Sequence, residues 1–169
     1  MKEKMGYRNA ERVYALAARG LLGTKRDGKP RLNDRALNVL MFMALKSASK
    51  EDSKVVRGTA PYWCYWGGWN ELITATGMAA ASADSTAEEL LSEESLSEAA
   101  VRRRTAMNKI SITATFLQKN GVIKKLRPAN KMAGSNTIWL LLLGTEEENE
   151  EAERRARQYF GLPMAIKEQ

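Results

Sequence analysis

The sequence predicts an α+β protein that is mainly α-helical and carries one small β-hairpin. Several segments repeat apolar residues at intervals of three and four, which is typical of helices packed on a core. Two short apolar runs, at residues 121–128 and 136–143, flank a loop containing Gly, Asn and Pro, which is typical of a hairpin. With 169 residues and 44% hydrophobic residues, the chain is long enough to bury a core.

The composition argues against catalysis. There is no histidine and only one cysteine, Cys64, so the commonest general base is missing and no thiolate or imidazole zinc site can be built. Residues 23–29 (GTKRDGK) approach the spacing of a phosphate-binding loop, but Pro30 stands where a hydroxyl residue should meet magnesium. We interpret this segment as a flexible basic turn between two helices. We predict no enzymatic activity, no cofactor, no metal site and, from the lone cysteine, a reducing cytoplasm.

Charge is the strongest indication of function. The net charge is +7 and the isoelectric point about 9.6, which favours a polyanionic partner, nucleic acid before membrane. Nine basic residues and a single acid occur in residues 97–132, whereas acids crowd into residues 84–98 and 146–153. Such segregation predicts a basic face. No apolar run is long enough to span a bilayer.

Residues 1–32 are expected to form an N-terminal helical extension. Its helix, residues 8–22, has Val13 and Leu16 on one side. A second helix, residues 35–48, follows a cap at Asn33 or Asp34.

An aromatic element comes next. Residues 62–66 (YWCYW) are strand-prone, and two glycines end the strand. Its aromatic side chains are expected to pack in the core rather than to stack on bases, since no basic residue is interleaved with them. Residues 69–77 then predict a short helix that stops at Gly77.

Residues 78–96 form an Ala-, Ser- and Glu-rich acidic insertion. Ser85 and Glu88 have the spacing of a capping box, so the segment could hold a short helix or be mobile, and the sequence leaves both open.

The following run predicts a long helix from a cap at Ser97 to about Gly121. Its apolar side is expected to run over six turns: Leu96, Ala100, Val101, Met107, Ile110, Ile112, Ala114, Phe116 and Leu117. A polar face lies opposite, and its side chains can hydrogen-bond base edges and phosphates: Arg102, Arg103, Arg104, Thr105, Asn108, Lys109, Ser111 and Thr115. We therefore predict that this helix binds DNA.

The hairpin that follows carries a long basic tip. Its packed face is expected to contain Ile123, Leu126, Ile138, Leu140 and Leu142. A winged helix-turn-helix has the order helix, short helix, long helix and basic hairpin, and the sequence predicts this order over residues 33–144. On or beside the wing, five residues are expected to contact the DNA backbone or minor groove: Lys124, Lys125, Arg127, Asn130 and Lys131.

The order of these motifs over residues 33–143 resembles the winged-helix domain of bacterial plasmid and phage replication proteins. The aromatic element before the first helix-turn-helix helix and the pattern L-x-x-x-G-x-I at Leu117 to Ile123 carry the resemblance. It is shared with multiple-antibiotic-resistance-type and other winged-helix transcription regulators. The insertion replaces a short turn and the recognition helix is longer than in the family, so either its 102–105 end or its 108–115 middle could read bases.

Residues 145–169 predict a C-terminal helix. Thr145 and Glu148 form a capping box, and acids and arginines pair at i,i+4: Glu150–Arg154, Glu151–Arg155 and Glu153–Arg157. Its apolar end at Tyr159-Phe160 and the N-terminal helix could pair two copies or fold back on their own domain.

The leading hypothesis is a sequence-specific double-stranded DNA-binding protein that acts as a plasmid or phage replication initiator. The alternatives are a winged-helix transcriptional repressor, which uses the same binding chemistry, and a protein-interaction module without DNA. We expect a homodimer, possible contacts with replisome or host proteins, no membrane contact, and a cytoplasmic location on the nucleoid or a plasmid.

Overall fold

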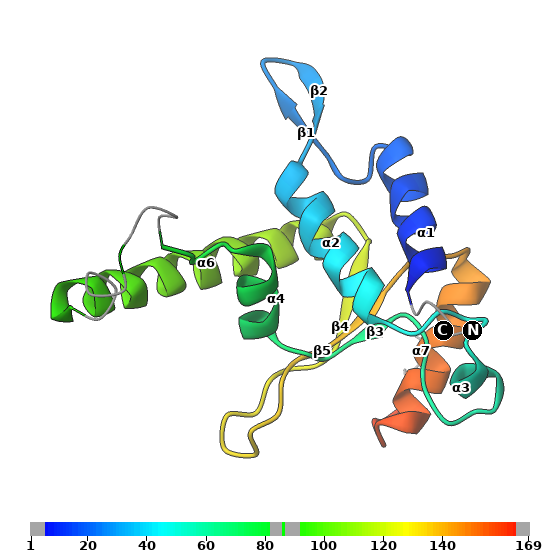
Figure 1. The fold of residues 1–169 in the computed structure, drawn as a ribbon. Coiled ribbons are helices and arrows are strands. Elements are labelled where there is room, and N and C mark those ends of the chain that lie inside the picture. Colours follow the sequence, from blue (N-terminus) through cyan, green and yellow to red (C-terminus); the bar gives the residue numbers. More distant parts are fainter. Residues whose placement is uncertain (1–5, 82–85, 87–91, 165–169) are drawn as a thin grey trace.

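The computed structural model describes residues 6–81, 86 and 92–164 (Figure 1). The described residues are 52% helical and contain two small antiparallel sheets, so the α+β prediction is confirmed at this level. The proposed capping box at Ser85 and Glu88 lies outside the described residues. Within the described part of the chain, no helix is long and apolar enough to cross a membrane.

Two N-terminal helices pack against each other. Helix α1 (Tyr7–Ala18) buries Val13 and Leu16, and helix α2 (Asp34–Lys46) begins at the predicted cap, where the Asn33 side chain accepts a hydrogen bond from the Ala36 amide at 3.1 Å. The buried Asn9 amide donates to the carbonyls of Ala44 (3.1 Å) and Ser47 (3.0 Å) at the end of α2. These bonds satisfy orphan carbonyls of that helix and fix α1 on its own domain.

The segment between these helices is a β-hairpin, not the flexible turn that the sequence suggested. Strands β1 (Gly23–Arg26) and β2 (Lys29–Leu32) pair in antiparallel fashion around Asp27-Gly28. Both turn residues have positive φ, 52° and 75°, as a two-residue type I′ turn requires. The Asp-Gly pair is typical of a hairpin turn and could have predicted this hairpin. The residues beside it include Lys and Pro, which are uncommon in strands, so the sequence did not indicate strands there.

The second sheet has three strands in the order β3-β5-β4, all antiparallel. Strands β4 (Ile123–Arg127) and β5 (Ile138–Leu141) are the predicted hairpin, and β3 (Cys64–Tyr65) from the aromatic element joins its far side. Every residue of β5 is buried, on both faces of the sheet. This explains the continuous apolar run in the sequence, because a strand covered on both faces does not alternate.

Three further helices lie in the described residues between α2 and β4. A single turn, α3 (Ser53–Val56), lies in the predicted polar connection, and α4 (Trp69–Thr76) ends at Gly77, whose φ of 66° is the predicted C-cap. The long helix α6 (Glu93–Lys119) begins at a Ser92 cap rather than at Ser97, because the Ser92 hydroxyl accepts from the Ser95 amide.

Only the second half of α6 is packed on the core. Ile110, Ala114 and Leu117 are buried as predicted, and α2, α4 and β4 pack against this half of the helix. In contrast, Leu96 and Val101 are 57% and 62% exposed, so the expected six-turn buried side is wrong for the N-terminal half; Ile112, 68% exposed, was also expected to be buried. Periodicity shows which residues share a face, but not whether another element lies opposite it. The first half of α6 extends beyond the domain (Figure 1).

Helix α7 (Glu146–Tyr159) has the predicted capping box between Thr145 and Glu148. The Arg155–Glu151 (2.7 Å) and Arg157–Glu153 (2.8 Å) pairs form as predicted, and Arg154 contacts Glu151. Glu148 also accepts from Arg12 of α1 and from Lys50, which fixes α7 on the domain.

The aromatic residues divide into core and surface groups. Tyr62 and Trp63 are fully buried, and the Trp63 carbonyl accepts from the Leu141 amide at 2.7 Å. Trp66, which the sequence analysis assigned to the core, is 44% exposed and contacts Phe160 of the C-terminal segment edge-on, with ring centroids 5.2 Å apart. The end of α7 therefore packs on its own chain.

This division predicts different stabilities for two tryptophan variants. Trp63→Ala should lower the free energy of unfolding by about 3–5 kcal/mol, because it empties a buried site. Trp66→Ala should cost only about 1 kcal/mol, the value of one aromatic pair at a partly exposed site. Chemical denaturation of both variants measures the difference, and equal losses would contradict the packing described here.

Candidate nucleic-acid interface

The outer face of α6 carries four of the eight contact residues predicted on this helix. Arg104, Asn108, Ser111 and Thr115 follow at intervals of three or four residues, and all four are exposed. Exposed Ile112 and Lys119 lie on the same face, although the sequence analysis placed the first on the apolar side and left out the second. Their spacing from Asn108, four and eleven residues, was the signal that could have placed them there.

The hydroxyl groups on this face bond within the helix. Ser111 donates to the Met107 carbonyl and Thr115 to the Ser111 carbonyl, each at 3.0 Å. Because the donors are used in this way, both residues present an oxygen acceptor outward, and Thr115 also presents a methyl group. Arg104, Asn108 and Lys119 therefore remain the outward donors of this face.

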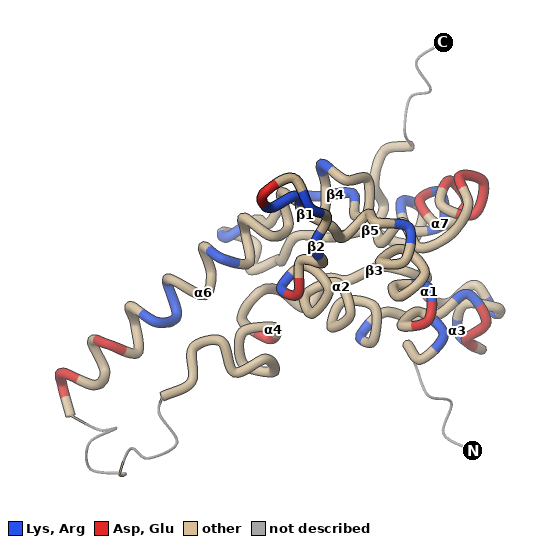
Figure 2. Tube along the Cα trace, turned by 90° about the horizontal axis from the view of Figure 1, so that it is seen from above, with Lys and Arg blue, Asp and Glu red and all other residues tan. Residues whose placement is uncertain are grey.

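Charge changes sign along α6. The first turns carry Glu93, Glu94 and Glu98, and Arg102 is paired with Glu98 at 3.3 Å. Arg103 and Arg104 form no ion pair among the residues described by the structure. Figure 2 shows the acidic tip followed by the basic segment. An acidic tip is repelled by phosphate, so a nucleic-acid interface on this helix would begin near residue 103.

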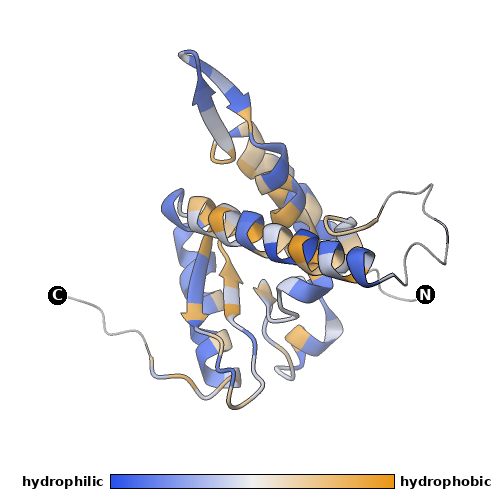
Figure 3. Ribbon diagram, turned by 90° about the vertical axis from the view of Figure 1, so that its left-hand side faces the viewer, coloured by the Kyte–Doolittle hydropathy of each residue, from blue (hydrophilic) through white to orange (hydrophobic). Residues whose placement is uncertain are grey.

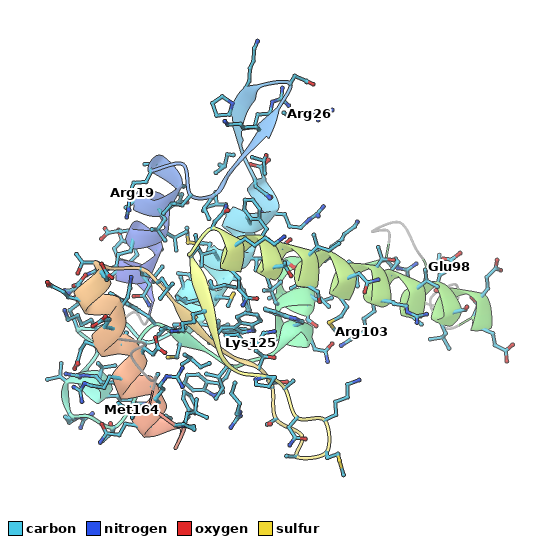
Figure 4. The ribbon with its side chains drawn as sticks, turned by 180° about the vertical axis from the view of Figure 1, so that it is seen from behind. Arg19, Arg26, Glu98, Arg103, Lys125 and Met164 are labelled. Carbon is cyan, nitrogen blue, oxygen red and sulfur yellow. The ribbon has the colours of Figure 1, made fainter. Side chains whose placement is uncertain are left out.

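The predicted basic residues of α6 do not all face the same way. Arg103 lies five residues before Asn108, so it projects on the other side of the helix from the outer face. In Figure 4, Arg103 lies below α6, on the side of the loop between β4 and β5. Thr105 and Lys109 are exposed and lie beside the outer face.

The loop at residues 128–137 is ordered by Asn130. An isolated bridge joins Asn130 to Ser135, and the Asn130 side chain accepts from the amides of Met132 (3.0 Å) and Ala133 (3.2 Å). Asn130 thus shapes the tip, while Lys131 and the fully exposed Met132 form its outer surface. An open groove of about 690 Å³ runs from Met107 of α6 to this loop.

The basic residues of β4 lie on opposite faces of the sheet, as successive strand residues must. Lys124 turns to α7, where its amine is 2.7 Å from a Glu153 carboxylate oxygen. Lys125 turns the other way, with its amine 5.3 Å from the centre of the Trp139 ring. Arg127 is half-buried. The structure thus groups Lys125 with the loop and separates Lys124 from it.

Outside α6 and the loop, the groups with shifted pKa values are buried or hydrogen-bonded within the chain. Burial raises the pKa of the Cys64 thiol, so this cysteine is a poor nucleophile. Burial also raises the pKa of Tyr65, helped by the neighbouring Glu71. Hydrogen bonds from Arg154 and Arg155 lower the pKa of Glu151 to about 2. Over the described residues, no group of three or more acidic or cysteine side chains could hold a metal ion.

Comparison of the chain with protein-family models, with curated proteins and with solved structures gives no match in any of the three. The functional argument therefore rests on the geometry above.

Proposed function

We propose that this protein is a sequence-specific double-stranded DNA-binding protein of winged helix-turn-helix architecture. The element order α2-α3-β3-α4-α6-β4-β5, with a loop between the last two strands, supports this architecture. The sheet order β3-β5-β4 agrees with it, because the wing strands are completed by a short strand that precedes the helix pair. In this arrangement α4 and α6 are the helix pair and residues 128–137 are the wing.

The observation that carries the proposal is the outer face of α6. It is exposed, basic and polar, and it contains no acid after Glu98. A helix fits the major groove of B-DNA, where Arg recognises guanine and Asn recognises adenine through paired hydrogen bonds. The exposed Ile112 side chain and the Thr115 methyl group are suited to contact the methyl group of thymine.

The charge reversal favours the middle of α6 as the base-reading segment. The acids before residue 99 would oppose phosphate, and Arg102 is engaged by Glu98. Arg104, Asn108 and Ser111 then lie at the centre of the proposed interface. Arg103 and the wing residues Lys125 and Lys131 would contact the backbone on one side of the groove.

Replication initiation at a plasmid or phage origin is the role that we propose for this DNA binding, and transcriptional repression is the alternative. An initiator should bind repeated sites in an origin, whereas a repressor should bind its promoter. A protein-interaction module would bind acidic proteins in place of DNA. Loss of DNA affinity with rising salt, together with discrimination between sequences, would exclude that module.

Replacement of Arg104 or Asn108 by Ala should reduce binding to the preferred duplex by about 1–3 kcal/mol and relax discrimination at the base pair concerned. The preferred duplex is selected by the wild-type chain from a random library, and affinity is measured by fluorescence anisotropy. Arg57→Ala is the control of equal charge, because Arg57 is the C-cap of α3, at the other end of the domain (Figure 1). Normal, discriminating binding by both α6 variants would exclude this recognition face.

The wing should supply affinity without sequence preference. The double variant Lys125→Ala/Lys131→Ala should weaken preferred and random duplexes by the same factor and reduce the slope of log K against log salt by about 1.8. Lys124→Ala is the matched control, since its amine is already paired with Glu153 at 2.7 Å and should not change the slope. An equal effect of Lys124→Ala and Lys125→Ala would remove the wing from the interface.

We also propose that two copies bind one DNA site. The apolar sides of α1 and α7 are used within the chain, but Tyr7 and Tyr14 on the outer side of α1 are 59% and 60% exposed. If two copies pair through this side of α1, light scattering should give two wild-type chains per duplex. Tyr14→Glu should give one chain per duplex, because burying the new carboxylate in the contact is unfavourable. A single wild-type chain on a non-repeated half-site would contradict the dimer.

A further inference from the structure

The β1–β2 hairpin projects from the domain and contributes nothing to its core. All residues of β2 and all but the first of β1 are exposed. Figure 3 shows the hairpin standing clear of the packed helices and largely hydrophilic. An isolated two-stranded hairpin is marginally stable at best in water, so its retention as an ordered element points to a role outside the core.

The strand register gathers positive charge on one face of the hairpin. Arg26 pairs with Lys29 and Thr24 with Arg31, and these four side chains share one face because strand residues alternate. Lys25, Pro30 and Leu32 occupy the other face. The hairpin therefore has one face with three cations and a hydroxyl.

None of these cations is neutralised within the described part of the chain, where no ion pair involves Lys25, Arg26, Lys29 or Arg31. The Arg26–Lys29 pair places like charges directly across the strands, which costs about 0.2–1 kcal/mol. Because no carboxylate of the described residues offsets this repulsion, the surface is complementary to an external anion.

The base of the hairpin is held against α6. Leu22 is fully buried, and its carbonyl accepts from the Asn33 amide at 2.9 Å. The Asn120 side chain, at the C-terminal end of α6, donates to the Leu21 carbonyl at 2.8 Å. The direction of the hairpin is therefore set relative to the helix whose outer face is the proposed recognition surface.

The hairpin and the wing flank α6 on opposite sides. In Figures 1 and 4, the hairpin rises above α6 with Arg26 at its end, and the loop between β4 and β5 extends below it. Lys119, on the last turn of α6, continues the exposed face of Asn108 and Thr115 toward the hairpin base. Basic residues thus lie on both sides of the proposed reading helix.

We propose that the β1–β2 hairpin is a second DNA-binding arm, in which Arg26, Lys29 and Arg31 bind the phosphate backbone on the side of the major groove opposite the wing. This inference rests on the proposed function of α6. The ligand chemistry is a duplex backbone rather than unpaired bases, since the hairpin has no aromatic side chain on which a base could stack. The arm would add affinity independent of sequence.

The test compares two triple variants of the full chain on a 40-base-pair duplex of random sequence. Arg26→Ala/Lys29→Ala/Arg31→Ala should reduce the salt slope by about 2.7 and weaken binding roughly 100-fold at 0.15 M salt. The control Arg8→Ala/Lys54→Ala/Arg57→Ala removes the same charge from the start of α1 and from α3 with its C-cap, and should change the slope far less. Equal slopes for the two triple variants would overturn the proposal.

A second variant separates binding from hairpin folding. Arg26→Glu places opposite charges across the strands at Lys29, which favours the hairpin while reducing its charge. A weaker, less salt-dependent complex formed by this variant supports a direct contact. Wild-type affinity and slope in Arg26→Glu would overturn it.

Hydroxyl-radical footprints on the selected duplex locate the contact. Lys125→Ala/Lys131→Ala should lose protection at one flank of the DNA site, and the hairpin triple variant should lose protection at the opposite flank. Loss of protection at the same flank in both variants, or no loss in the hairpin variant, would refute the arm. If the wild-type chain binds no duplex even at 50 mM salt, the proposed function and the arm both fail. If it binds and Arg104→Ala relaxes discrimination while the two triple variants behave alike, only the arm fails.

Discussion

Burial of β5 on both faces is the constraint on which the rest of the fold depends. This strand pairs with β3, which precedes the helix pair, and with β4, which follows it, so it closes the chain around α4 and α6. Its apolar side chains are covered, and neither of its edges is open. Because β4, α2 and α4 cover one side of the second half of α6, the opposite side of that half faces solvent. The exposed polar face is therefore a consequence of how β5 is buried.

Local signals in the sequence were sufficient for much of the fold. Asn33, Gly77 and the Thr145–Glu148 box were predictable because a cap depends on residues three or four positions apart. The pairing of β3 with β5 was not predictable, since it joins residues more than 70 positions apart and β3 is only two residues long. The N-terminal half of α6 was misjudged for a related reason: whether an apolar stripe is buried depends on elements distant in the chain.

The candidate site shows the same limit at the level of single side chains. The polar face of α6 followed from helical spacing, and Arg104, Asn108, Ser111 and Thr115 are exposed as predicted. Arg102, predicted on the same face, is half-buried and paired with Glu98. Lys124 and Lys125 could not be separated by composition, although strand alternation requires them to point in opposite directions. That Lys124 meets Glu153 depends on how α7 packs, which no local pattern contains. The hairpin cations were visible in the sequence, but their common face required the register of β1 and β2.

The ion pairs are distributed unevenly, so that some charged groups of this protein are neutralised and others are not. In α7, hydrogen bonds lower the pKa of Glu148 and of Glu151, and at Glu153 bonds from Lys124 and Arg157 outweigh the opposing effect of burial. These acids remain charged at neutral pH and are matched by bases of α7, α1 and β4. The cations of the β1–β2 hairpin and Arg104 have no such partner among the described residues. Cations without a carboxylate partner thus lie both on α6 and on the hairpin, and such a local excess of positive charge favours a polyanionic partner.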